Sequence, residues 1–125
     1  MTALNTVACT LLSTTNVSLA SNADTTLYTV PPGKTCLLCY AILVCNENAN
    51  STDFSIGRDG AETDFIPTNQ LDNLDASADA VILMPVPSTT PTKTKVYGTG
   101  VNIQAKVSNQ AGGNTNTLFL FGILY

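Results

Sequence analysis

Residues 27–46, LYTVPPGKTCLLCYAILVCN, contain the turn and the strand on which the fold assignment depends. Pro32 fixes φ and Gly33 tolerates positive φ, the combination that a type II turn requires. The run 35–45 that follows is apolar at both odd and even positions. Because side chains of a strand alternate between its two faces, this strand is expected to be covered on both sides.

Three of the four cysteines lie in this strand. Strict alternation sends Cys36 and Cys39 to opposite faces, so that their thiols cannot bind one metal ion. Cys39 and Cys45 share a face, but six residues of extended chain separate them by roughly 20 Å, beyond the reach of a disulfide. Cys9 pairs with one of them only if the tertiary fold brings it there. We therefore interpret the cysteines as small, reduced core residues of a protein made in a reducing cytosol.

Short strands separated by turn signals account for most of the remaining chain. Asp59-Gly60 predicts a hairpin with a type I′ turn, which requires positive φ at both central positions. Residues 101–108 alternate apolar and polar, and residues 117–125 (TLFLFGILY) are apolar on both faces. The pattern predicts one all-β domain over residues 1–125: an antiparallel, two-sheet β-sandwich of jelly-roll type. Residues 1–20 are expected to supply an N-terminal arm and an edge strand.

Composition excludes several functions. The net charge is −4 with only five Lys and Arg, whereas nucleic-acid binding needs clustered cations. No stretch approaches the roughly 20 apolar residues of a membrane helix. The 14 charged residues are outnumbered by 39 Thr, Asn and Ser, and a surface so weakly charged has little protection against self-association. We therefore expect a protein that assembles with copies of itself, without nucleic acid or membrane.

Residues suited to catalysis are scarce. The chain has no histidine, which is the commonest general base and metal ligand. Glu62 and Asp64 share one face of a strand, where solvation explains them better than acid–base catalysis. A hard cation bound by Asp72, Asp75 and Asp79 stays open as an alternative to turn and capping roles. We predict that the protein is not an enzyme, with no catalytic, cofactor or metal residues and no cofactor.

Several short motifs together resemble small structural proteins of tailed bacteriophages. They are LYTVPPGKT at residues 27–35, VCN at 44–46, the Asp59-Gly60 hairpin, YGTG at 97–100 before the alternating strand, and Gly122 near the C-terminus. The resemblance spans roughly residues 25–125. It implies a β-sandwich virion component, commonly a homotrimer, whose partners are the major capsid protein or other virion proteins.

The last strand predicts where the copies meet. Phe119, Phe121, Ile123 and Tyr125 share one of its faces, and leaving them in water would create an unusually large apolar patch. We predict that these four residues form an oligomer interface, unless residues 1–20 cover them within one chain. The resulting hypothesis is a capsid decoration (cement) protein, located in the virion. The alternatives are a tail, baseplate or fibre accessory protein of the same fold, and a module that binds host glycans through exposed loops.

Overall fold

The computed structural model describes residues 9–45, 52–71, 78–85, 94–108 and 116–125 of the 125-residue chain. These residues form nine β-strands and no helix. The strands are β1 (Thr10–Val17), β2 (Ala23–Thr29), β3 (Cys36–Val44), β4 (Asp53–Arg58), β5 (Ala61–Gln70), β6 (Ala80–Leu83), β7 (Val96–Tyr97), β8 (Asn102–Ser108) and β9 (Asn116–Leu124).

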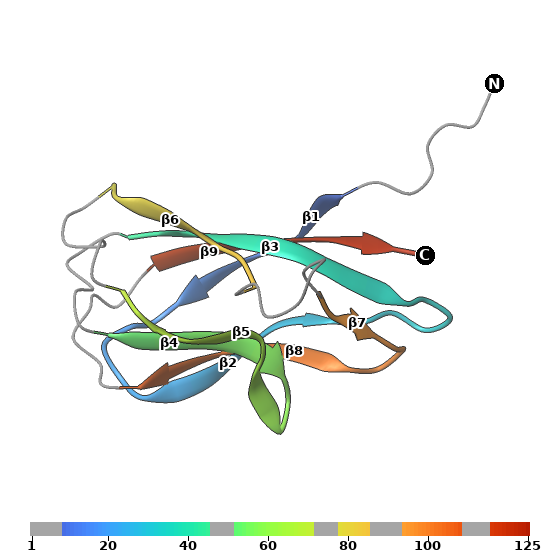
Figure 1. Cartoon of the computed structure of the whole chain (residues 1–125), viewed down its shortest axis with the longest axis horizontal. Coiled ribbons are helices and arrows are strands. Elements are labelled where there is room, and N and C mark those ends of the chain that lie inside the picture. Colours follow the sequence, from blue (N-terminus) through green and yellow to red (C-terminus); the bar gives the residue numbers. More distant parts are fainter. Residues whose placement is uncertain (1–8, 46–51, 72–77, 86–93, 109–115) are drawn as a thin grey trace.

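The strands form two antiparallel sheets that lie face to face (Figure 1). Sheet I has the strand order β1-β9-β3-β6, with the short strand β7 also pairing with β3. Sheet II has the order β2-β8-β4-β5. Each sheet therefore mixes strands from both ends of the chain, and consecutive strands such as β1 and β2 or β3 and β4 lie in different sheets. The predicted all-β, two-sheet sandwich is confirmed.

The core lies between the sheets and is built from the inward-facing side chains of both. Alternation along β8 buries Ile103, Ala105 and Val107, as the sequence pattern predicted. The largest fully buried side chains are Val17, Leu38, Leu43, Leu118 and Leu120 from sheet I, Phe54, Ile56, Ile66 and Ile103 from sheet II, and Leu19 and Val30 from the connections. Burying one such side chain contributes about 1.5–3 kcal/mol, so these contacts hold the two sheets together.

The turn between β2 and β3 has the predicted geometry. The backbone N–H of Lys34 donates to the Pro31 carbonyl at 3.2 Å, and Gly33 has φ of +74°. A positive φ at the third residue of the turn is the mark of type II. The turn reverses the chain and takes it from β2 in sheet II to β3 in sheet I.

The hairpin between β4 and β5 is confirmed, but the predicted type I′ turn is wrong. Arg58 pairs with Ala61 across the two-residue connection, and Gly60 has φ of +86°. Asp59 does not share this conformation, because Ala78 is the only non-glycine residue with positive φ in the described part of the chain. The register of the two strands also shifts between Ile56 and Arg58. This irregularity adjusts the strand twist, which removes the need for a type I′ turn.

The predicted assignment of faces along β3 is wrong for its first half. The register against β9 shifts between Leu38 and Tyr40, so the alternation restarts after Cys39. The buried face consists of Cys36, Leu38, Ala41, Leu43 and Cys45. Contacts outside the strand ladder support the irregularity: the Leu38 N–H donates to the Lys95 carbonyl at 3.1 Å, and the Thr94 hydroxyl donates to the Leu38 carbonyl at 2.7 Å.

Three predicted segments have different outcomes. Residues 10–17 form β1, an edge strand of sheet I, whereas residues 1–8 lie outside the described ranges. β5 continues beyond the hairpin through Pro67 to Gln70, and its place at the edge of sheet II explains why a proline is tolerated there. Asp72 and Asp75 of the possible cation site lie outside the described residues, so that alternative stays untested.

Candidate functional site

Sheet I exposes an outward face that carries no charged side chain and is apolar except for Thr14, Asn16 and Thr117. Opposite residues form cross-strand rows on this face, which the strand registers define. We call their side chains the apolar face: Leu11, Thr14 and Asn16 of β1; Thr117, Phe119, Phe121 and Ile123 of β9; Leu37, Tyr40, Ile42 and Val44 of β3; Ala80 and Ile82 of β6; and Val96 of β7. Tyr125, just after β9, continues it.

The four residues predicted to form an interface all belong to this region. Phe119, Phe121 and Ile123 are partly buried by their neighbours on the same face, and Tyr125 is 54% exposed. The Phe121 ring stacks on Tyr40, with ring centroids 4.7 Å apart and planes 17° from parallel. The two rings therefore form a rigid aromatic pair in the middle of the face, opposite each other on β9 and β3.

The sequence pattern of the last strand did not reveal how far the apolar face extends. Leu11, Ile82 and Val96 are 50%, 65% and 52% exposed, and they lie on the three strands that flank β9 and β3. Each was missed because its strand is short or weakly patterned. With four rows of side chains across four strands, the face measures on the order of 500 Å². The largest apolar patch on a monomeric soluble protein is commonly of this size, and it is often functional.

No strand of sheet I contains an Asp, Glu, Lys or Arg. Sheet II differs: its strands contain Asp24, Asp53, Arg58, Glu62, Asp64 and Lys106. Its outward side chains also bond to one another; the Thr29 hydroxyl donates to Asn102 Oδ1 at 2.6 Å and Gln104 Nε2 to Thr26 Oγ1 at 3.3 Å. The outward face of sheet II is therefore suited to water, and that of sheet I is not.

Within one chain, β1 does not cover the apolar face. The alternative prediction placed residues 1–20 over that face, but β1 is hydrogen-bonded beside β9 as an edge strand. Its side chain Leu11 therefore enlarges the exposed apolar area instead of hiding it. Residues 1–8 lie outside the described chain.

The cysteines do not all behave as predicted. Cys36 and Cys45 are fully buried, in agreement with the core interpretation, and Cys39 is partly buried. Cys9 is exposed, so the prediction of four core cysteines is wrong for it. Cys9 precedes β1, an edge strand whose first two residues, Thr10 and Leu11, are also exposed. No group of three or more possible metal-ligating side chains is found in the described residues.

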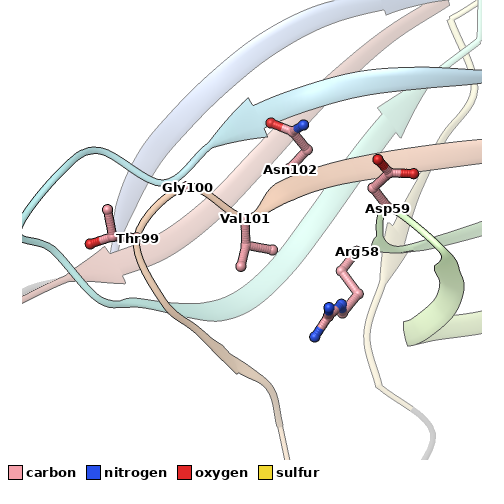
Figure 2. A pocket seen from close by; sticks show the side chains of 6 residues that line it. All are labelled: Arg58, Asp59, Thr99, Gly100, Val101 and Asn102. Carbon is pink, nitrogen blue, oxygen red and sulfur yellow. The ribbon is translucent and has the colours of Figure 1, made fainter.

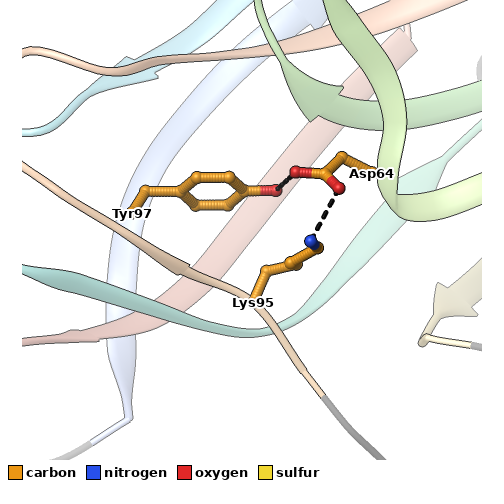
Figure 3. Close-up of polar contacts among 3 residues, drawn as sticks. All are labelled: Asp64, Lys95 and Tyr97. Carbon is orange, nitrogen blue, oxygen red and sulfur yellow. Dashed lines mark hydrogen bonds and ion pairs between the residues drawn. The ribbon is translucent and has the colours of Figure 1, made fainter.

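The two carboxylates singled out in the sequence have structural partners. Glu62 accepts a hydrogen bond at 2.7 Å from the Gly60 N–H and so closes the tip of the hairpin. Asp64 accepts a bond from the Tyr97 hydroxyl at 3.1 Å and forms an ion pair with Lys95 at 2.8 Å (Figure 3). Because Asp64 belongs to β5 and Tyr97 to β7, this group joins the two sheets along one side of the sandwich. Both carboxylates serve the fold.

Alkaline pH is expected to destabilise the protein through two buried groups. Burial raises the pKa of the Cys36 thiol from an ordinary 9.0 to about 11. Burial, and to a lesser extent the negative Asp64 carboxylate, also raises the pKa of Tyr97. As the pH rises, each group ionises first in the unfolded chain. Stability is therefore lost from about pH 9 to 11 through Cys36 and from about pH 10 upward through Tyr97, by about 1.4 kcal/mol per pH unit for each ionising group.

Urea unfolding at fixed protein concentration, from about pH 8 to about pH 11, measures this loss. Cys36→Ala is expected to show a shallower slope above pH 9, and Tyr97→Phe above pH 10, because each lacks one ionising group. Equal slopes in the wild type and in both variants would assign the alkaline loss to other groups.

An open cleft lies between the β4–β5 turn and the segment that leads into β8. It is lined by Arg58, Asp59, Thr99, Gly100, Val101 and Asn102, and encloses about 340 Å³ (Figure 2). The Arg58 and Asp59 side chains point to different sides in Figure 2, so that they do not converge on one point. None of the described residues that line the cleft has an aromatic ring. A glycan site would be expected to combine polar groups with an apolar or aromatic surface.

Comparison of the chain with known protein families, characterised proteins and solved structures finds no match. None of the described residues forms a helix that is long and apolar enough to span a membrane. The functional assignment therefore rests on the geometry of the two sheets and on the resemblance of the sequence motifs.

Proposed function

We propose that this protein is a non-enzymatic structural protein of a tailed-phage virion that assembles through the apolar face. The observation that carries the proposal is the contrast between the two sheets: sheet II presents charged and polar side chains to water, whereas sheet I has none that is charged. A protein that functions as part of an assembly needs an uncharged, apolar surface that its neighbours can cover. No catalytic constellation competes with it among the described residues.

The order of the strands supports a jelly-roll assignment for the sandwich. Four strands in the order β1-β9-β3-β6 face four in the order β2-β8-β4-β5, and the chain crosses between the sheets at each of its first three connections. Jelly rolls occur in viral capsid proteins and also in lectins, so the architecture agrees with a virion role without deciding it. The apolar face favours assembly over glycan binding.

Within the virion, we propose capsid decoration as a homotrimer; the trimer and the decoration role come from the resemblance of the motifs. The face itself supports association. Each of its exposed large side chains gains up to about 1.5–3 kcal/mol, the value for full burial, when it is transferred from water into a contact. Several such side chains per copy suffice to hold a symmetric oligomer together.

The location and copy number of the protein in purified particles test this function. A decoration protein is expected on the outside of the head, in a fixed ratio to the major capsid protein. Cryo-electron microscopy of particles, with quantitative mass spectrometry of their proteins, measures both. Density at the tail or baseplate would contradict capsid decoration and would support the role of a tail, baseplate or fibre accessory protein. Absence from the particles would contradict a virion function altogether.

A further inference from the structure

The edges of the two sheets differ in how well they are protected against pairing with another strand. A sheet edge presents unpaired backbone N–H and C=O groups, and natural proteins block such edges with charged residues, proline or very short strands. Three of the four edges in the described chain have such a block. β2 contains Asp24, β5 contains Glu62, Asp64 and Pro67, and the edge of sheet I opposite β1 is divided between β6, of four residues, and β7, of two.

The fourth edge, β1, has none of these features. Its eight residues, Thr10–Val17, include no charged residue and no proline. Its register against β9 shifts between Leu11 and Ser13 and is regular from Ser13 to Val17. β9 is the one described strand with which β1 pairs. The regular part of β1 therefore presents ladder N–H and C=O groups that no described strand takes up, and an extended strand is the partner that fits them.

The side chains of β1 also indicate a missing neighbour. Ser13 Oγ is the one buried side-chain polar atom that lacks a hydrogen-bond partner among the residues that the structure describes. Unsatisfied groups of this kind are uncommon. On the outward side, Thr14 and Asn16 are exposed, and Thr117 lies opposite Asn16 on β9. The polar side chains of the apolar face, apart from its tyrosines, are therefore gathered along the β1 edge.

We propose that β1 is a second contact surface, at which β1 of another copy of this chain adds as an antiparallel strand. The regular residues of the two strands overlap fully when the twofold axis passes beside Thr15. Thr14 then lies opposite Asn16 of the second copy, where the hydroxyl and the amide can form a hydrogen bond. On the inward side, Thr15 of the second copy lies diagonally across from Ser13.

This pairing has a consequence for the apolar face. The twofold axis between two identical antiparallel strands is perpendicular to the sheet, so both copies present the same face to the same side. Two sheets of type I therefore join into one continuous sheet, in the order β6-β3-β9-β1 followed by the same strands in reverse. The two apolar faces become a single surface, twice as large, with the polar residues of β1 enclosed at its centre.

The contact is expected to be weak between free chains. A strand pair of this length buries much less than the roughly 1,000 Å² that a stable interface needs, so it does not hold two chains together at micromolar concentration. Copies bound side by side on one particle have a high effective concentration, at which such pairing is populated. The contact rests on the proposed function in this respect alone, because it uses the edge of sheet I and not its face.

Disulfide trapping tests the contact and its register. Thr14→Cys/Asn16→Cys, made in a Cys9→Ala background to remove the exposed native thiol, is oxidised with copper phenanthroline at high protein concentration. Peptide mapping without reductant then identifies the links. A covalent dimer is expected, in which position 14 of one copy is joined to position 16 of the other. Trapping accumulates transient pairs, so it detects the contact even where the dimer is scarce at equilibrium.

Thr26→Cys/Thr29→Cys in the same background is the matched control. Both positions are exposed on the outward face of β2, an edge strand that Asp24 protects. This variant is expected to link at least about tenfold more slowly. The proposal is overturned if the β1 variant forms no dimer, if it links no faster than the β2 variant, or if positions 14 and 16 are joined in the statistical mixture that chance collisions give.

Charge pairs provide a second measurement that does not depend on cysteine chemistry. In a Phe121→Asp background, which is designed to remove the contact through the apolar face, Thr14→Lys/Asn16→Asp places opposite charges across the proposed axis, whereas Thr14→Lys/Asn16→Lys places like charges. In sedimentation at low salt, the first is expected to dimerise at a concentration at least about tenfold lower. General repulsion acts in the other direction, because the variant with two lysines has the smaller net charge. Equal association of the two variants would contradict the pairing.

The failure of this contact and the failure of assembly through the apolar face give different results. A wild-type oligomer whose cysteine variant forms no link between positions 14 and 16 would retain the face and exclude the β1 contact. A wild-type monomer whose cysteine variant forms that link would retain the β1 contact and exclude the face.

Discussion

Phe121→Asp is expected to convert the wild-type oligomer into a soluble, folded monomer. Phe121 stacks on Tyr40 at the centre of the apolar face, and its side chain does not enter the core. A carboxylate there is solvated in the monomer but would be buried without a partner in an assembly. Losing the apolar contact and burying the charge together are expected to weaken each contact by at least about 4 kcal/mol, about a thousandfold in affinity.

Sedimentation velocity at micromolar concentration, with circular dichroism as the check on the fold, measures this change. Two variants are matched controls. Leu120→Asp changes the neighbouring residue of β9, which is fully buried on the opposite face, and is expected to abolish folding. Gln104→Asp puts the same charge on the outward face of β8, in sheet II, and is expected to leave the oligomer unchanged.

The wild type is expected to sediment as an oligomer, with a trimer as the favoured state. If the wild type is a monomer at micromolar concentration, the proposal that it assembles through the apolar face is wrong. A Phe121→Asp protein that still assembles would place the contact on another surface. Because Phe121 and Leu120 are adjacent in sequence but face opposite ways, the pair separates loss of association from loss of folding.

The sandwich could be predicted because its strands carry their own signals. The alternating β8, the Pro-Gly turn after β2 and the Asp59-Gly60 hairpin are each specified by a few neighbouring residues. β3 and β9, the two strands that are apolar on both faces, are neighbours in the interior of sheet I. Their inward faces belong to the core, as residue types predicted, whereas coverage of their outward faces stays a prediction.

The irregular positions could not be predicted, because distant segments decide them. The shift at Cys39 depends on the hydrogen bonds that Thr94 and Lys95 make with Leu38. β7 has two residues and therefore no periodicity to detect. In each case the residues that determine the local structure are distant in sequence. Periodicity within a short window of sequence does not detect them.

Gly57→Ala is expected to damage the fold more than any other exchange of a glycine for alanine in the described chain. Gly57 is buried in β4, where β5 crosses it closely. A Cβ at this position would lie 2.6 Å from the Asp64 nitrogen and 2.7 Å from the Glu62 carbonyl carbon, and it would also collide with the Ala61 carbonyl oxygen. All three atoms are backbone, so a side-chain rotation cannot relieve the clash.

The first half of β5 would have to move to admit the methyl group. That movement would pull Asp64 away from Tyr97 and Lys95, and so break the polar link between the sheets. We expect a loss of at least about 3 kcal/mol, at the upper end of what overpacking costs. For a domain of this size, the loss corresponds to a fall in Tm of at least about 10 °C, or to failure to fold.

Gly98→Ala is the matched control for this prediction. A Cβ at Gly98 meets no atom within 4 Å, and its backbone is not in the positive-φ region. Its expected effect on the free energy of unfolding is below about 1 kcal/mol. Thermal unfolding of the two variants beside the wild type, at equal concentration, compares them. If Gly57→Ala melts as Gly98→Ala does, β5 does not cross β4 as closely as the structure shows, and the position of Asp64 between the two sheets would have to be revised with it.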